Sequence, residues 1–175
     1  MPSREGIFPL VERGLDHVDR IQEQWARERP DLDTSPQGLI GRTHRIADRL
    51  MEELLVVYRR HGLGQGEFDV LATLRRAGAP FELTPSALAQ TTMVTSGAVT
   101  KRLDRLETAG LVRRQPSDLD GRGRVVGLTE AGRRLIDQAY TEHMENEHRL
   151  VAGLDADERA QLEHLLRRWA LSLGA

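Results

Sequence analysis

The stretch "TSGAVTKRLDRLETAGLVRRQPSDLDGRGRVVGLTEAG", residues 95–132, decides the fold. In its first part Val99, Leu103 and Leu106 repeat at spacings of four and three, which predicts a helix that buries this face. Thr95 is a suitable N-cap for that helix, and Gly110 suits its C-terminal end. The period then changes, so a different kind of element must follow.

Two short runs rich in β-branched residues come next. "LVRRQ" and "RVVGLT" bracket the turn formers "PSDLDG", a pattern that predicts a hairpin with a turn of several residues. Upstream, "LTPSALAQTT" predicts a short helix with Thr84 as its N-cap and Pro85 at its first position. The order of short helix, turn, helix and hairpin predicts a winged helix-turn-helix.

Further amphipathic helices surround this unit. The apolar spacing predicts them over about 9–28, 37–61, 66–78, 129–153 and 154–173. Thr129 is the expected N-cap of the fourth, and Asp155 with Glu158 has capping-box spacing at the start of the fifth. The predicted fold class is mainly α (α+β). We expect N-terminal helices in residues 1–61, the winged helix-turn-helix domain in 62–130 and C-terminal helices in 131–175.

The predicted helix after Thr95 would turn a DNA-binding face to solvent. With its apolar positions buried, the outward residues are Ser96, Gly97, Thr100, Lys101, Asp104 and Arg105. The small, hydroxylated first half suits deep entry into the major groove, where Ser and Thr reach base edges or phosphates. The helix N-terminus offers backbone N–H groups to a phosphate, and Lys101 and Arg105 would contact the backbone or a guanine.

The predicted hairpin adds a basic wing. Residues 95–124 hold seven basic and four acidic side chains, an excess of three positive charges in a chain whose net charge is −2. Glycines flank Arg122, with Arg124 just beyond, and such a thin basic tip fits the minor groove. A hairpin tip with arginines is, taken alone, usually a solvated turn. The order of all the parts is the more specific signal.

Composition narrows the alternatives. The 175 residues contain no cysteine, which excludes disulfides, a thiol nucleophile and a cysteine zinc site. No apolar run suits a signal peptide or a membrane span, so we expect a cytoplasmic protein. Catalytic and cofactor-binding motifs are missing, and His143 and His148 are five apart, which does not suit chelation. We expect no enzyme, cofactor or metal site. A protein adaptor is a third alternative, against which the basic excess argues.

The chain resembles the MarR family of bacterial transcription regulators over roughly residues 39–173. The resemblance rests on "LGQGEFDVLATLRRAG", "LTPSALAQTTMVTSGAVTKRLDRLETAGLVRR" and "DLDGRGRVVGLTEAG". Many members carry Asp-Arg-Arg where this chain has Asp-Gly-Arg, which displaces one wing arginine. The family implies a homodimer that reads a palindromic operator as a repressor and loses affinity on binding a small ligand. Independently, Leu162, Leu165, Leu166, Trp169 and Leu171 exceed what a lone winged helix needs, which favours a dimer.

The N-terminal stretch "DRIQEQWARERPDLDTSP" is similar to the urate-responsive subgroup, which includes PecS-like regulators. This resemblance implies that Trp25 stacks on the ligand, that Asp69 and Arg114 bind its polar edge, and that Arg102 connects the site to the DNA-reading helix. The effector would be urate or another anionic or phenolic compound. Two alternatives remain: Trp25 as a core or dimer-interface residue, and Asp69 with Arg114 as a purely structural ion pair.

Overall fold

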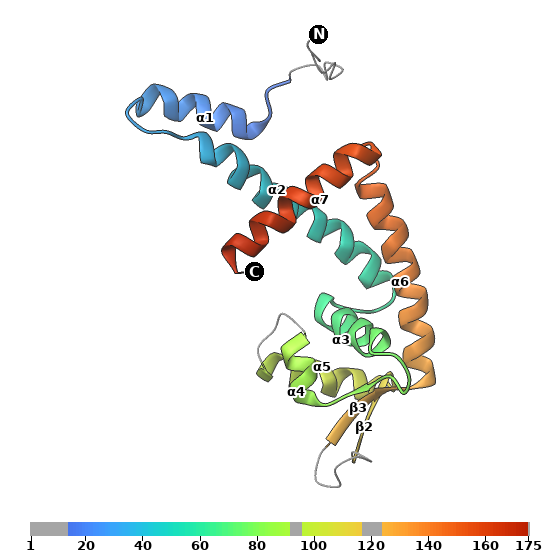
Figure 1. The fold of residues 1–175 in the computed structure, drawn as a ribbon. Helices are drawn as coiled ribbons and strands as arrows, with labels where there is room; N and C mark the ends of the chain where they lie inside the picture. Colours follow the sequence, from blue (N-terminus) through green and yellow to red (C-terminus); the bar gives the residue numbers. More distant parts are fainter. Residues whose placement is uncertain (1–13, 92–95, 117–123, 175) are drawn as a thin grey trace, which may run out of the picture. The chain divides into compact units, whose positions relative to one another are not determined.

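The computed structural model describes residues 14–91, 96–116 and 124–174. It is mainly helical with one small antiparallel sheet (Figure 1), which confirms the predicted fold class. In chain order its elements are α1 (His17–Glu28), α2 (Ser35–Arg60), α3 (Gln65–Arg76), β1 (Glu82–Leu83), α4 (Pro85–Thr91), α5 (Ser96–Thr108), β2 (Val112–Pro116), β3 (Arg124–Leu128), α6 (Glu130–Leu150) and α7 (Ala156–Leu173).

The chain forms two compact units, Met1–Leu50 and Met51–Ala175, and α2 contributes residues to both. In the first unit α1 begins later than the expected residue 9. Gly14 and Leu15 are not helical, and residues 9–13 lie outside the described part. The reason is a capping box, in which Asp16 accepts the backbone N–H groups of Val18 and Asp19 and fixes the helix start at His17.

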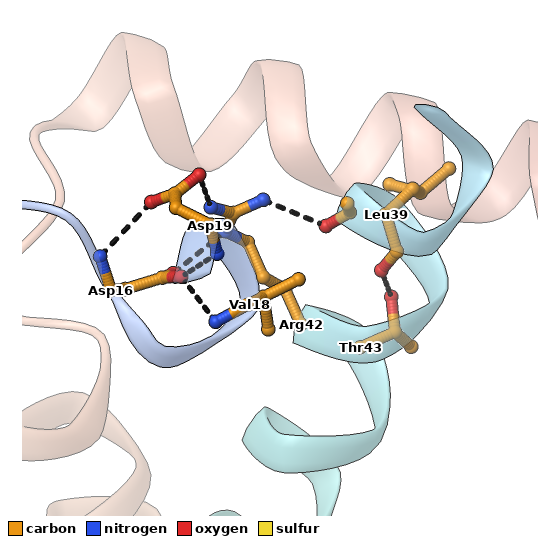
Figure 2. A network of polar contacts seen from close by, with 7 residues as sticks. Asp16, Val18, Asp19, Leu39, Arg42 and Thr43 are labelled. Carbon is orange, nitrogen blue, oxygen red and sulfur yellow. Dashed lines mark hydrogen bonds and ion pairs between the residues drawn. The ribbon is translucent and has the colours of Figure 1, made fainter. Parts of the chain in front are cut away.

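One arginine joins α1 to α2 within this unit (Figure 2). Arg42 donates from Nε to the Asp16 carboxylate at 2.8 Å and pairs with Asp19 through another nitrogen. Its remaining nitrogen donates to the Gly38 carbonyl at 3.0 Å. The hydrogen bonds from the Asp19 N–H and from Arg42 lower the pKa of Asp16. The same carboxylate therefore caps one helix and anchors it to the next.

The core of the second unit lies between α3, α5, α6 and the sheet. Its largest fully buried side chains are Leu71, Leu74, Leu88, Ile136, Val70 and Val126. Leu103 and Leu106 of α5 are each 2% exposed, which confirms the inward face predicted for this helix. The side chain of Val99 lies outside the described residues. This packing fixes which face of α5 points away from the core.

The sheet has three strands in the order β1-β3-β2, all antiparallel. The hairpin of β2 and β3 is as predicted, but β1 was not expected, because two residues carry no readable strand pattern. Glu82 of β1 accepts hydrogen bonds from Arg113 at 3.2 Å and Gln115 at 2.8 Å. Its side chain crosses Gly127, where a Cβ would lie 2.7 Å from Glu82 Cγ. Small β1 thereby braces the base of the wing.

The helix ends follow their capping residues. Thr84 accepts the N–H of Ala87 at 3.1 Å, and Asp155 and Glu158 form the expected capping box. Thr129 accepts the N–H of Gly132 at 3.0 Å, which confirms it as the N-cap of α6. The last helical residue of α6 is Leu150, and residues 151–153, predicted as helix, form a turn. Gly110 ends α5 with a φ of 70°.

The start of α6 leaves no room for a side chain at Gly132. A Cβ there would lie 1.9 Å from the Leu111 carbonyl oxygen, which belongs to backbone and cannot move away cheaply. We predict that Gly132→Ala lowers the free energy of unfolding by about 3 kcal/mol in urea denaturation. Gly153→Ala is the matched control, since no atom lies within 4 Å of its Cβ position. Equal stability of the two variants would contradict this packing.

Candidate nucleic-acid interface

The outward face of α5 is the centre of the interface. Thr100, Lys101, Asp104 and Arg105 are exposed, as predicted, while the opposite face is in the core. Ser96 and Gly97 form the first turn of the helix, and Thr95 lies outside the described residues. An exposed helix with small residues first and cations one turn later has the shape and charge to enter a major groove.

The wing continues this surface. Arg124 opens β3 and is exposed, and Arg113 of β2 is exposed as well. Arg122, the predicted minor-groove residue, lies outside the described residues. The described part of the wing thus presents positive charge from the same sheet that packs against α5.

Arg114 ties α5 to the wing. Its guanidinium donates to Asp104 and to Glu107, each at 2.6 Å, and its backbone N–H donates to Glu107 at 3.2 Å. The side chain is 23% exposed, and these bonds, that with Asp104 foremost, raise the pKa of Arg114. The interpretation of Asp69 and Arg114 as an ion pair is wrong, because Arg114 pairs with α5 instead. We call Arg114 with Asp104 and Glu107 the α5–β2 clamp.

Asp69 and Arg102 meet on the other side of α5. Asp69 is half-buried, and burial raises its pKa, while the positive charge of Arg102 acts in the opposite direction. Arg102 packs on Gly66 of α3, where a Cβ would lie 2.1 Å from the guanidinium carbon. Nη1 of Arg102 is buried and has no hydrogen-bond partner among the described residues. A buried donor without a partner, beside a buried carboxylate, is a place where a polar ligand could bind.

A weaker contact also joins α5 to α3. Glu67 caps α3 by accepting the Gly64 N–H at 2.6 Å, and its second oxygen lies 3.5 Å from Arg105. Arg105 is largely exposed, so this ion pair contributes little stability by itself. It leaves the Arg105 guanidinium at the surface, near an acid that a phosphate would have to outcompete.

Trp25 belongs to the first unit and is 46% exposed. The interpretation of Trp25 as a core residue of the single chain is therefore wrong. It lines an open hollow of about 540 Å³ whose other walls include Leu32, Pro36, Ile40 and His44. An exposed indole beside apolar side chains suits either a flat ligand or a second protein surface. Its roles as ligand or dimer-interface residue both stay predictions.

Sequence reasoning missed the partners of the predicted cations. Asp104, Glu107 and Glu67 entered the sequence argument only as local negative charges, and Gly66 not at all. A usable signal exists for two of them: Asp104 and Glu107 are three apart, so they share one side of α5 and suit a single arginine. Within the described ranges, no group of three His, Asp or Glu side chains could hold a metal ion.

These features together define a winged helix-turn-helix DNA-binding domain. Residues 61–123 match the model of the MarR family. The chain is 40% identical over 151 residues to the HTH-type transcriptional regulator PecS of Dickeya dadantii (strain 3937), covering 86% of this chain and 91% of that protein. It is 35% identical over 131 residues to the multiple antibiotic resistance protein MarR of Escherichia coli (strain K12), covering 74% and 87%.

A solved structure of a mutant MarR from E. coli, complexed with operator DNA, is also similar. Its TM-score is 0.66 at 29% identity, with 82% of this chain and 96% of that chain covered. The chain therefore belongs to the MarR family and is a DNA-binding transcription regulator that resembles PecS.

The α5–β2 clamp makes a prediction about dynamics. Arg114→Gln removes two charge-assisted hydrogen bonds to α5, so the amides of residues 100–108 should exchange with deuterium about fivefold faster. The measurement is hydrogen exchange followed by mass spectrometry. Arg134→Gln, which removes only an exposed pair on α6, is the control and should leave these amides unchanged. An unchanged rate in Arg114→Gln would show that the clamp does not restrain α5.

Proposed function

We propose that this regulator is a repressor that binds a palindromic operator as a homodimer and releases it when a small anionic or aromatic compound such as urate binds. The observation that carries the DNA-binding half is the α5 surface, exposed and cationic on one side and locked in the core on the other. The ligand-binding half rests on the exposed Trp25 and on the buried charges of Asp69 and Arg102.

The proposed DNA contacts divide by type. Thr95, Ser96, Gly97 and Thr100 at the start of α5 face base edges and phosphates, and Lys101 and Arg105 bind the backbone or a guanine. Arg122 and Arg124 of the wing enter the minor groove. The E. coli relative in complex with operator DNA supports this use of the fold.

Dimerisation would use the helices on either side of the DNA-binding domain, in residues 1–61 and 131–175. No residue of α7 is buried in the single chain, although α7 carries the exposed Leu162, Leu165, Leu166 and Leu171. Such a continuous apolar face on an exposed helix calls for a partner, and a second copy supplies one. Two α5 helices would then read half-sites about 34–36 Å apart.

The effector would act on the charges that hold α5. A flat anion offers a ring face to Trp25, N–H groups to Asp69 and negative charge to Arg102 and Arg114. If it binds Arg114, it competes with Asp104 and Glu107 and loosens the α5–β2 clamp. That change in charge pairing would move the DNA-reading helix and lower the affinity for the operator. We place the protein in the cytoplasm, where DNA and metabolites meet; no helix of the described residues is long and apolar enough to cross a membrane.

A second reading keeps the DNA-binding regulator and removes the urate-type site, with Trp25, Asp69 and Arg114 structural. One observation favours it: Arg114 already has two carboxylate partners on α5. Fluorescence anisotropy separates the two readings. The purified protein is titrated onto labelled DNA from upstream of its own coding region, with and without urate. Release by urate supports the first reading; tight binding that ignores urate supports the second; binding no tighter than to random DNA contradicts both.

The wing assignment predicts a change in salt dependence. Arg122→Ala should lower the affinity for all DNA sequences and reduce the slope of log affinity against log salt by about 1, because one phosphate contact is lost. Arg134→Ala on α6 is the matched control, and its slope should equal that of the wild type. An unchanged slope in Arg122→Ala would remove the wing from the interface.

The ligand assignment predicts that Trp25→Ala abolishes the urate response while the affinity for DNA stays nearly the same. The physical reason is that an exposed indole contributes stacking area to the ligand but little to the packing of its own chain. The readouts are anisotropy with urate and the molar mass of the protein by light scattering. A dimer that dissociates in Trp25→Ala would make the residue part of the subunit interface instead.

A further inference from the structure

A hollow with a cavity volume of about 450 Å³ lies between α3 and α6, which pack against each other (Figure 1). Its floor is apolar and is formed by Ala72 and the fully buried Ile136. Its rim carries an aromatic ring, Tyr140, and two cations, Arg75 and Arg76. None of these residues takes part in the proposed contacts with DNA or in the proposed urate site.

Tyr140 forms the aromatic wall and is held in place while staying accessible. Its ring is 13° from parallel to that of Phe68 with centroids 6.3 Å apart, and it lies 5.6 Å from the ring of His143. The residue is nevertheless 48% exposed. A ring fixed on one side and open on the other is preorganised to pack against a second flat group at low entropic cost.

Arg75 is also held in a defined position. Its Nε donates to Asp137 of α6 at 2.7 Å, and its guanidinium carbon lies 5.0 Å from the centroid of the Phe81 ring. Among the described residues, Nε is the guanidinium nitrogen of Arg75 that is hydrogen bonded, which leaves the terminal nitrogens for another acceptor. The terminal edge of a guanidinium matches a carboxylate in two-point contact.

The charge around the hollow is positive on balance. Asp137 is the acid in its lining, while Arg75 and Arg76 both line it. Arg133 adds a further positive charge nearby, since its guanidinium carbon lies 6.0 Å from the same Phe81 ring. A negative ligand therefore meets more attraction than repulsion at this surface.

We infer that this hollow binds a small planar aromatic carboxylate. The ring packs on Tyr140, Ala72 and Ile136, and the carboxylate accepts hydrogen bonds from the terminal nitrogens of Arg75. The bound carboxylate competes with Asp137 for Arg75, and the Arg75–Asp137 bridge is a direct polar link between α3 and α6. The inference goes beyond the proposed urate-type effector, because it concerns separate residues and stands or falls independently of Trp25, Asp69 and Arg114.

The chain offers a clean spectroscopic test, because it contains two tyrosines, and Tyr58 is buried while Tyr140 is exposed. The ring signals of ¹³C-labelled tyrosine are followed in the full-length protein during titration with benzoate. We expect saturable shifts of the Tyr140 ring with a Kd of about 1 mM, as suits a ligand of this size, and little change at Tyr58. Benzyl alcohol has the same ring without the charge and should bind about tenfold more weakly.

Variants locate the site. Arg75→Gln should weaken benzoate binding about tenfold, whereas Arg134→Gln, an exposed arginine outside the hollow, and Trp25→Ala should leave it unchanged. The thermal midpoint of each variant is measured beside the titration, and the comparison of benzoate with benzyl alcohol on the wild-type protein needs no variant at all. The inference is overturned if the Tyr140 signals do not saturate, if both ligands bind equally, or if a folded Arg75→Gln binds benzoate like the wild type.

Discussion

The pairing of Arg114 with Asp104 and Glu107 is the interaction on which the DNA-binding surface depends. The apolar side of α5 is anchored by Leu103 and Leu106, but packing on one face leaves a helix free to slide or tilt. The two ion pairs at 2.6 Å fix its polar side to β2, and hence to the wing. Helix and wing must reach two grooves of one duplex together, so their mutual position matters more than the strength of any one contact.

The same interaction gives the regulator a physical means of response. Charge pairs that are partly exposed contribute little net stability, and a competing anion can replace their carboxylates at low cost. Arg114 is where the structural and the proposed ligand roles of one residue meet. Arg102 on the opposite side of α5 differs, because its guanidinium packs over Gly66 and one of its nitrogens is buried without a partner among the described residues. A small anion would meet a paired cation on one side of the helix and an unsatisfied donor on the other.

Much of this arrangement can be predicted from sequence, and the rest fails for identifiable reasons. Apolar period and capping residues predicted the helices and the hairpin, because Thr84, Thr129 and Asp155 act locally. The start of α1 was missed because Asp16 and Asp19 cap it inside an amphipathic stretch. Two-residue β1 has no period to detect. The DNA-facing residues of α5 followed from its buried face, but the partner of Arg114 did not, since Asp69 and Asp104 look equally suitable until the chain is folded.

The most direct test of the account measures the separation of the two α5 helices in the dimer. The chain has no cysteine, so Thr100→Cys places a single spin label on the exposed side of α5 in each subunit. Double electron–electron resonance then reports one distance between the two subunits. The account predicts a distribution centred at about 35 Å, the spacing of successive major grooves on one face of DNA. A sample without dipolar modulation, or one whose distances exclude that spacing, would contradict a dimer that presents two recognition helices to one operator.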